Sequence, residues 1–268
     1  MAFVDNETPE LARVYDQISD SQCENGCRLI EAMHVRAGDH VLDVGCGTGR
    51  LALYVSGIVG PAGSVTGLDP SSHRVRMACE KLEADGIRNV NFSIGQGEDL
   101  NSLSDSWFDA VYYSAVFHWI DDKKAALREA YRVLKPGGTV GIYTGCRGDG
   151  SSTRGSIRQI VLGRESGWRS QSERAGSIWL TKEELKSLLD EAGFTKVAIE
   201  QRPAVKYFQS ADDYFLWLQA SSSGRRSNAP EHVRAEVRWR IAEELEKRRT
   251  PQGIEVRSSI LFATASKP

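Results

Sequence analysis

The fold is decided by a stretch that reads Val41-Leu42-Asp43-Val44-Gly45-Cys46-Gly47-Thr48-Gly49-Arg50. A short apolar run leads into three glycines at alternate positions, and a helix is predicted from residue 50 to 58. Glycines at such a strand-to-helix turn let a ligand approach the main-chain N–H groups closely. The dinucleotide fingerprint G-x-G-x-x-G would need glycine where this chain has Arg50. The carboxyl group of Asp43 would repel a pyrophosphate but tolerate a ligand that carries an amine and a sulfonium.

The sequence around this stretch alternates between strand and helix patterns. Short β-branched runs predict strands at 40–44, 64–69, 89–94, 108–113 and 139–143. Apolar residues at helical spacing predict helices at 9–36, 50–58 and 123–134, and a further helix that carries Val75, Ala78 and Leu82. This alternation requires an α/β fold with a doubly wound parallel sheet and helices on both of its faces.

The pattern changes after Tyr143. A capping box at Thr181-Lys182-Glu183-Glu184 predicts a helix to Ala192, and strands are expected at 196–207 and 254–265. Between these elements the patterning is weaker. We therefore expect one domain over 1–268, made of an N-terminal helical lid (1–36), a ligand-binding core (37–146) and two cap insertions (147–180 and 209–253).

Composition narrows the class of partner. The formal net charge of −2 over 268 residues argues against nucleic acid or an anionic membrane as the main partner. No apolar run approaches the roughly 20 residues of a membrane span, and the N-terminus has acids where a signal peptide would be basic and then apolar. Five cysteines without a CxxC pair predict neither a disulfide framework nor a metal site. We expect a cytoplasmic protein, and its oligomeric state stays open.

A second acid follows the next predicted strand. Asp69 lies 20 residues after Gly49, at the point where an acid can accept hydrogen bonds from both ribose hydroxyls of a bound nucleoside. Asp69 could alternatively cap the helix that begins after Pro70-Ser71. Its spacing from the glycine loop favours the ribose interpretation.

Five motifs now stand in order along residues 41–143. They are Asp43-x-Gly45-x-Gly47-x-Gly49, Asp69, Gly95-Gln96-Gly97-Glu98-Asp99-Leu100, Phe108-Asp109 and Arg132-Val133-Leu134-Lys135-Pro136-Gly137-Gly138. Together they resemble the class I S-adenosylmethionine (SAM)-dependent methyltransferases, most closely the branch with the ubiquinone/menaquinone-pathway and trans-aconitate enzymes. The resemblance implies SAM as cofactor. It also implies a Rossmann-like seven-stranded sheet of order 3-2-1-4-5-7-6, with the last strand antiparallel and helical cap insertions.

The resemblance also implies which residues contact the cofactor. Gly45 and Gly47 would contact the methionine portion, with Asp43 near its amino group, and Asp69 would hold the ribose. Ser114, at the end of the fourth strand, would lie beside the sulfonium. The complete set of expected cofactor contacts is Asp43, Gly45, Cys46, Gly47, Asp69, Pro70, Gln96, Gly97, Glu98 and Ser114.

The catalytic residues are less strongly indicated. Methyl transfer needs a nucleophile placed in line at about 3 Å, and an O or N acceptor can also need a base. His118 follows the fourth strand, where acceptors bind, and is our candidate base or orienting group; a structural histidine packed beside Trp119 is the alternative. Tyr15 is a candidate lid residue, with core packing as its alternative.

The late segments carry aromatic and basic residues. The aromatic residues could line an acceptor pocket or pack in a core: Trp168, Trp179, Tyr214, Phe215, Trp217 and Trp239. The basic runs Arg225-Arg226 and Lys247-Arg248-Arg249 are typical of a solvated face, or could attract an anionic acceptor.

Related activities fit the sequence less well. A nicotinamide-dependent dehydrogenase lacks its third fingerprint glycine here. A DNA amino-methyltransferase would need a proline-containing run after the fourth strand, and arsenite methylation would need several converging thiols, with no cysteine after Cys146. We predict a methyltransferase for a small-molecule acceptor, with secondary metabolism as one setting. A SAM-binding protein that does not methylate, such as a SAM-assisted cyclase or a regulatory binder, stays the alternative.

Overall fold

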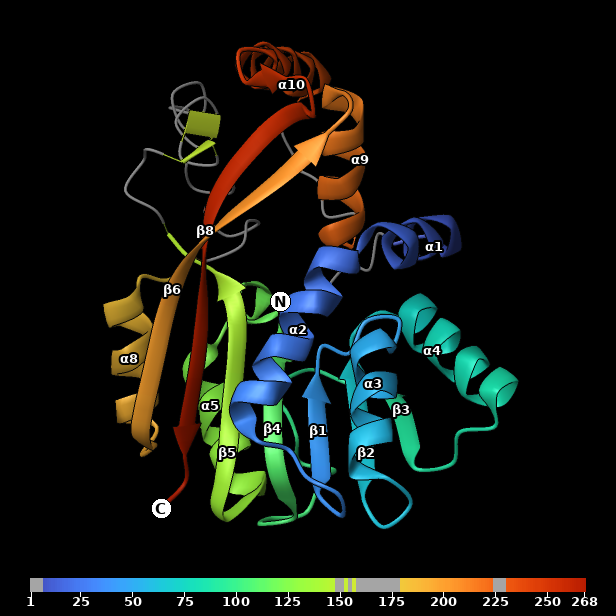
Figure 1. Cartoon of the computed structure of the whole chain (residues 1–268), viewed down its shortest axis with the longest axis vertical. Coiled ribbons are helices and arrows are strands. Elements are labelled where there is room, and N and C mark those ends of the chain that lie inside the picture. The colour runs from blue at the N-terminus through green and yellow to red at the C-terminus, as the bar shows by residue number, and fades with distance from the viewer. Residues whose placement is uncertain (1–6, 148–151, 154–155, 158–178, 224–229) are drawn as a thin grey trace.

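The strand that leads into the glycine loop, β1, lies in the middle of an eight-stranded sheet (Figure 1). The sheet order is β3-β2-β1-β4-β5-β8-β6, and the short strand β7 pairs with β8. Strands β1 to β5 are parallel, whereas β8 runs antiparallel to both β5 and β6. The strands are β1 (His40–Val44), β2 (Ser64–Asp69), β3 (Val90–Ile94), β4 (Phe108–Ser114), β5 (Leu134–Gly145), β6 (Thr195–Phe208), β7 (Arg249–Thr250) and β8 (Gly253–Ser266). The predicted order is confirmed, except that the two-residue β7 makes the last strand the eighth.

The computed structural model describes residues 7–147, 152–153, 156–157, 179–223 and 230–268. Trp168, the pair Arg225-Arg226 and most of the insertion predicted at 147–180 lie outside the described residues. Within those ranges, no helix is both long and apolar enough to cross a membrane.

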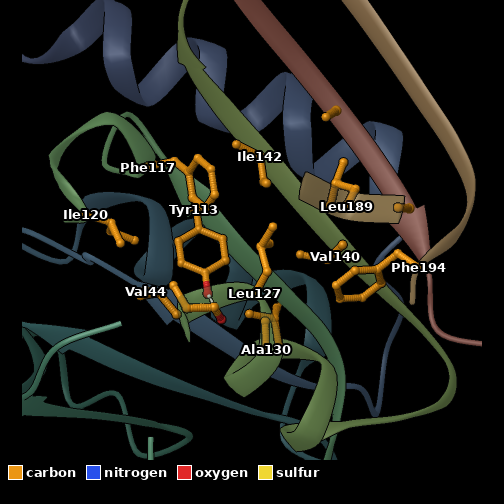
Figure 2. Packing of buried hydrophobic residues seen from close by; sticks show 14 of the residues in the cluster. Val44, Tyr113, Phe117, Ile120, Leu127, Ala130, Val140, Ile142, Leu189 and Phe194 are labelled. Carbon is orange, nitrogen blue, oxygen red and sulfur yellow. Dashed lines mark hydrogen bonds between the residues drawn. The ribbon is translucent and has the colours of Figure 1, made fainter. Parts of the chain in front are cut away.

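Alternate residues of β1 face opposite layers of the molecule. Leu42 and Val44 join the large apolar cluster under α5 (Lys123–Val133) and α8 (Lys182–Glu191), part of which Figure 2 shows. Val41 faces the other layer, formed by α2 (Asp20–Met33), α3 (Arg50–Val59) and α4 (Ser72–Asp85). Because the side-chain period of a strand is two, Asp43 lies on the same face as Val41. The carboxyl group of Asp43 therefore lies on the face that α2, α3 and α4 cover.

The N-terminal region differs from its prediction. The single helix expected at 9–36 is two helices, α1 (Pro9–Ile18) and α2, separated at Ser19. The guanidinium of Arg50 donates to the carbonyl oxygen of Asp16 at 2.9 Å and to the hydroxyl of Ser19 at 3.2 Å. A side chain from α3 thus satisfies a carbonyl at the end of α1, which the helix itself cannot do. The break lets α1 turn away from α2 above the sheet.

The start of β5 also differs from its prediction. The strand begins at Leu134 rather than Thr139, because Leu134 already pairs with Phe108 of β4. The register then shifts before Ala110 pairs with Thr139. The intervening Pro-Gly-Gly sequence therefore forms an irregularity within the strand.

Strands β6 and β8 continue past the rest of the sheet and carry a second, smaller core (Figure 1). The pairing of β8 with β5 ends at Ile260, whereas its pairing with β6 continues to Ile254. The helices α9 (Ala211–Ser221) and α10 (Glu231–Glu246) pack on this extension. The described part of the segment 209–253 therefore contains α9 and α10, which project beyond the carboxyl ends of the parallel strands.

Candidate functional site

The glycine loop connects β1 to α3 and is held against β2. The N–H groups of Gly45 and Cys46 both donate to the carbonyl oxygen of Leu68, at 2.7 and 3.0 Å. Gly45 and Gly47 have φ values of +79° and +54°, in the left-handed region that favours glycine. A Cβ on Gly45 would lie 2.3 Å from Cγ2 of Val116. The loop thus presents bare main chain at the carboxyl end of β1, as a closely approaching ligand requires.

Asp69 ends β2 beside this loop. Its Oδ2 accepts a hydrogen bond from the N–H of Gly47 at 2.9 Å, and its Oδ1 accepts one from the N–H of Ser71 at 2.9 Å. Burial raises the pKa of Asp69, while the nearby Arg74 guanidinium and these two N–H groups oppose the rise. Each carboxylate oxygen keeps lone pairs for a further donor. The side chain is oriented by the protein before any ligand hydroxyl is present.

Asp43 lies at the other side of the loop, only 1% exposed. Burial raises the pKa of its carboxyl group to about 8; interaction with the Tyr112 hydroxyl opposes this rise, and the charge of Asp69 adds to it. A buried carboxyl group of this kind gains from a cationic partner, which would favour its ionised form. An ammonium group is a partner of that chemistry.

Two cavities lie against the loop, and the open space within them, solvent included, is about 400 and 470 Å³. Tyr15, Gly45 and Ser114 line both cavities, so the two adjoin at these residues. The first cavity reaches Asp43, and the second reaches Asp69. The structure thus brings together seven of the predicted site residues as lining: Tyr15, Asp43, Gly45, Cys46, Asp69, Pro70 and Ser114.

The segment after β3 carries three of the predicted cofactor contacts. Gly97 lies against Val44, since a Cβ there would be 2.9 Å from Cγ1 of that residue. Glu98 accepts a hydrogen bond from the N–H of Asp121 at 3.0 Å, and Gln96 is exposed. None of Gln96, Gly97 and Glu98 lines either cavity. Their predicted contact with the adenine stays a prediction.

Tyr15 lies on α1 where the two cavities meet. Its ring centroid is 4.0 Å from Cζ of Arg74, and a Cβ on Gly47 would lie 3.5 Å from its Cε1. Burial raises the pKa of the Tyr15 phenol, with Arg74 opposing and nearby carboxylates adding to the rise. The phenol is neutral near pH 7, so the position suits a ring that covers the site better than a general base.

His118 lies outside the lining of both cavities. Its Nδ1 is 3.0 Å from the hydroxyl oxygen of Thr144 on β5, and its ring contacts those of Trp119 and Trp179. Trp119 itself lines the second cavity. The histidine is therefore next to the cavity wall and fixed by a partner on the neighbouring strand.

Several lining residues have no counterpart in the sequence prediction. Arg50 and Thr48 belong to the glycine stretch and could have been included by their position. The serines at 221–223 had no signal, because they lie some 150 residues from Asp69 in a weakly patterned segment. The remaining lining residues that were not predicted are Ser19, Gln22, Cys23, Leu51, Arg74, Ala115, Val116 and Trp119.

The late aromatic residues mostly form a core. Tyr214 and Trp217 pack against Phe208 in the small cluster of α9, α10 and the strand extension. Phe215 packs against this cluster too, while Trp239 is exposed. The described members of this late aromatic set are absent from the lining of both cavities: Trp179, Tyr214, Phe215, Trp217 and Trp239. The basic run at 247–249 is paired with Glu244 and Glu246, as expected for a solvated face.

Comparison with known proteins identifies relatives of this chain. A family model described as a methyltransferase domain matches residues 41–138. The chain is 33% identical over 189 residues to a demethylmenaquinone methyltransferase from Staphylococcus aureus, a match that covers 64% of the chain and 74% of that protein. It is 39% identical over 136 residues to an arsenite methyltransferase from Aquipseudomonas alcaligenes, covering 48% of the chain. The chain spans only 38% of the length of that second relative.

A solved structure shares the fold. A phosphoethanolamine N-methyltransferase from Haemonchus contortus, in complex with phosphomonomethylethanolamine and S-adenosylhomocysteine, superposes with a TM-score of 0.64. The match covers 97% of this chain and 58% of that chain at 17% sequence identity. At that identity the likeness shows the architecture alone.

Proposed function

Because the chain belongs to the class I SAM-dependent methyltransferases, we propose that it transfers the methyl group of SAM to a small-molecule acceptor by in-line SN2 displacement. The observation that carries the proposal is the hydrogen bond from Gly47 to Asp69, which joins the glycine loop to the acid at the end of β2. A bare loop and an oriented acid on neighbouring strands are what a nucleoside with a charged tail requires.

The cofactor residues fit this ligand. Asp69 would accept hydrogen bonds from the ribose hydroxyls, with Pro70 beside the adenine. Asp43, buried in the other cavity, would face the amino group of the methionine portion, which Gly45 and Gly47 would contact. In this arrangement the cofactor spans both cavities, and its centre lies where they adjoin. Gln96, Gly97 and Glu98 at the end of β3 complete the proposed adenine contacts.

The chemistry depends on position more than on acid or base groups. The sulfonium supplies a methyl group that already has a good leaving group. Gly45, Ser114 and Tyr15 line both cavities, so these residues surround the proposed transfer point. Here Gly45 leaves room, Ser114 offers a hydroxyl and the Tyr15 ring excludes water. Proximity and orientation are the main catalytic terms.

His118 is proposed as an orienting group or base for the acceptor. The Thr144 contact involves Nδ1 and so orients the imidazole ring. Trp119, next in sequence, already lines the second cavity, so a small side-chain movement would bring the imidazole to its edge.

The acceptor is proposed to be a small molecule, as the names of the relatives suggest for those proteins. Among the described residues, no group of three or more His, Cys, Asp and Glu is placed to hold a metal ion. Arsenite, a thiol-seeking acceptor, is for this reason not our choice. We propose a cytoplasmic location, in which the thiols would stay reduced. Residues 1–36 would form the lid, and the insertion at 209–253 would form part of the acceptor cap.

Calorimetric titration with SAM, and with NAD as a control ligand, tests the cofactor. We expect binding of SAM alone and its loss in Asp69→Ala; equal binding of both ligands, or full SAM affinity in the variant, would exclude the assignment. Mass spectrometry of an extract incubated with methyl-labelled SAM tests the reaction. A labelled product would identify the acceptor, whereas binding without any labelled product would favour the SAM-assisted cyclase or regulatory binder.

A further inference from the structure

A buried arginine in the first turn of α4 joins three separate parts of the chain. Arg74 is 6% exposed, and its Nε and Nη2 donate to Oε1 of Glu7 at 2.8 and 2.7 Å. The same Nη2 donates to the carbonyl oxygen of Ala220 at 2.7 Å. Glu7 precedes α1, and Ala220 lies in the last turn of α9. One guanidinium therefore holds segments that lie 67 and 146 residues away in sequence.

These two segments cover the cavities. We call residues 7–18 and 211–223 the covering segments; the first carries Tyr15, and the second carries the serines at 221–223 that line the second cavity. The helices α1 and α9 pack against each other, and in Figure 1 they meet above the carboxyl ends of the parallel strands. Arg74 contacts both segments, through Glu7 of the first and Ala220 of the second.

Arg74 is also directed at the cofactor site. Its guanidinium lies over the Tyr15 ring and lines the second cavity together with Asp69. Ser71 joins the same group, because its hydroxyl donates to Glu7 and its N–H donates to Asp69. Ser71 thus links the ion pair that holds the first covering segment to the proposed ribose acid, Asp69.

The ion pair between Arg74 and Glu7 is buried. The Glu7 side chain is fully buried and that of Arg74 is 8% exposed, so both charges have left water. Removing one partner of such a pair leaves the other charge buried and uncompensated. Release of the first covering segment would therefore have to return both charges to water.

We propose that Arg74 is a positioning residue that closes both covering segments over the bound cofactor and so sets the rate at which the cofactor leaves. This inference rests on the proposed function, since it takes SAM as the ligand beneath the segments. It assigns Arg74 no contact with the methyl group. Loss of the arginine should speed cofactor release.

Dissociation of SAM, followed by stopped-flow competition, tests the proposal in the full chain. We expect Arg74→Gln to release SAM at least about tenfold faster, and Glu7→Gln to release it faster as well. The double variant should be little faster than Arg74→Gln alone, because the two residues act through one contact. Glu10→Gln is the matched control, since Glu10 lies in the same segment and forms an exposed ion pair with Arg13. Unchanged release in both single variants would overturn the proposal.

Hydrogen exchange on the free protein separates this proposal from the cofactor assignment. We expect Arg74→Gln to speed amide exchange in both α1 and α9, and Glu7→Gln to speed it in α9 as well as in α1. If Arg74→Gln unfolds the whole protein, amide exchange will also become faster in β1 and β4. In that case Glu7→Gln provides the test. Exchange that changes in one covering segment only would overturn the coupling, whether or not SAM is the ligand.

Discussion

The N–H of Gly47 donates to the carboxylate of Asp69 over 2.9 Å, so the glycine loop and the end of β2 form a single unit. The other carboxylate oxygen is held by the N–H of Ser71. Orientation by two main-chain donors means that the acid need not reorganise when ribose hydroxyls arrive. This arrangement leads to the first of five predictions.

Asp69→Asn should weaken SAM binding at least about tenfold, because a hydrogen bond to a charged group contributes about 1.5–3 kcal/mol. Isothermal titration calorimetry gives the dissociation constant. Asp85→Asn, at the exposed end of the following helix, is the matched control and should leave affinity unchanged. Equal affinity of Asp69→Asn and wild type would remove Asp69 from the ribose site.

Cofactor affinity should depend on pH through Asp43. Its carboxyl group has a pKa of about 8, so it is mostly protonated at pH 7 and must lose a proton to pair with an ammonium group. SAM binding should therefore release close to one proton at about pH 7, and the dissociation constant should fall as pH rises through about 8. Titrations in buffers of different ionisation enthalpy measure that proton; Asp43→Asn should abolish its release.

The same carboxyl group should destabilise the free protein at high pH. Its pKa is raised above the usual 3.8, so the folded state keeps a proton that the unfolded state releases between about pH 4 and pH 8. The free energy of unfolding therefore falls as pH rises through that window. We expect Asp43→Asn to melt at a higher temperature than wild type at about pH 8.5, and at nearly the same temperature at about pH 4. A lower melting temperature of Asp43→Asn than of wild type at about pH 8.5 would contradict a buried Asp43 carboxyl group without a cationic partner.

Two glycines with left-handed backbone allow strain and crowding to be separated. Gly49 and Gly86 have φ values of +81° and +66°. A Cβ on Gly49 would lie 2.7 Å from the Phe92 ring, whereas a Cβ on Gly86 would meet nothing within 4 Å. We expect Gly86→Ala to cost about 1–2 kcal/mol of unfolding free energy from backbone strain. Gly49→Ala should cost about 1–3 kcal/mol more from overpacking, as measured by urea denaturation. Equal losses would mean that the Phe92 ring moves aside freely.

His118 can be tested with two substitutions of different shape. Asn at this position can still reach the Thr144 hydroxyl but has no group at the place of Nε2, whereas Ala loses both. If Nε2 serves the acceptor, both His118→Asn and His118→Ala should lower turnover at least about tenfold, with SAM affinity kept. Full turnover in His118→Asn, with a loss only in His118→Ala, would assign the residue to packing. Steady-state kinetics with the identified acceptor supplies the measurement.

The core of the fold could be predicted because its signals are local. The strand runs, the glycines and Asp69 each lie within a few residues of the elements that they define. The break at Ser19 could not be predicted, since it depends on Arg50 from another helix. The contact of Arg74 with Glu7 and Ala220 was also beyond reach, because no pattern around Arg74 indicates which distant segments will cover it. Such contacts are set by tertiary packing.

The helical cap begins and ends at neighbouring points. Phe208 at the end of β6 pairs with Ile254 near the start of β8, so the chain leaves the sheet for α9 and α10 and returns to the strand beside the one that it left. A hairpin tip of this kind accepts insertions of very different length without disturbing strand register. Evolution, or a protein engineer, could exchange residues 209–253 for another cap while keeping the sheet and the glycine loop. The geometry of the chain thus separates a segment that covers the second cavity from the sheet and glycine loop beneath it.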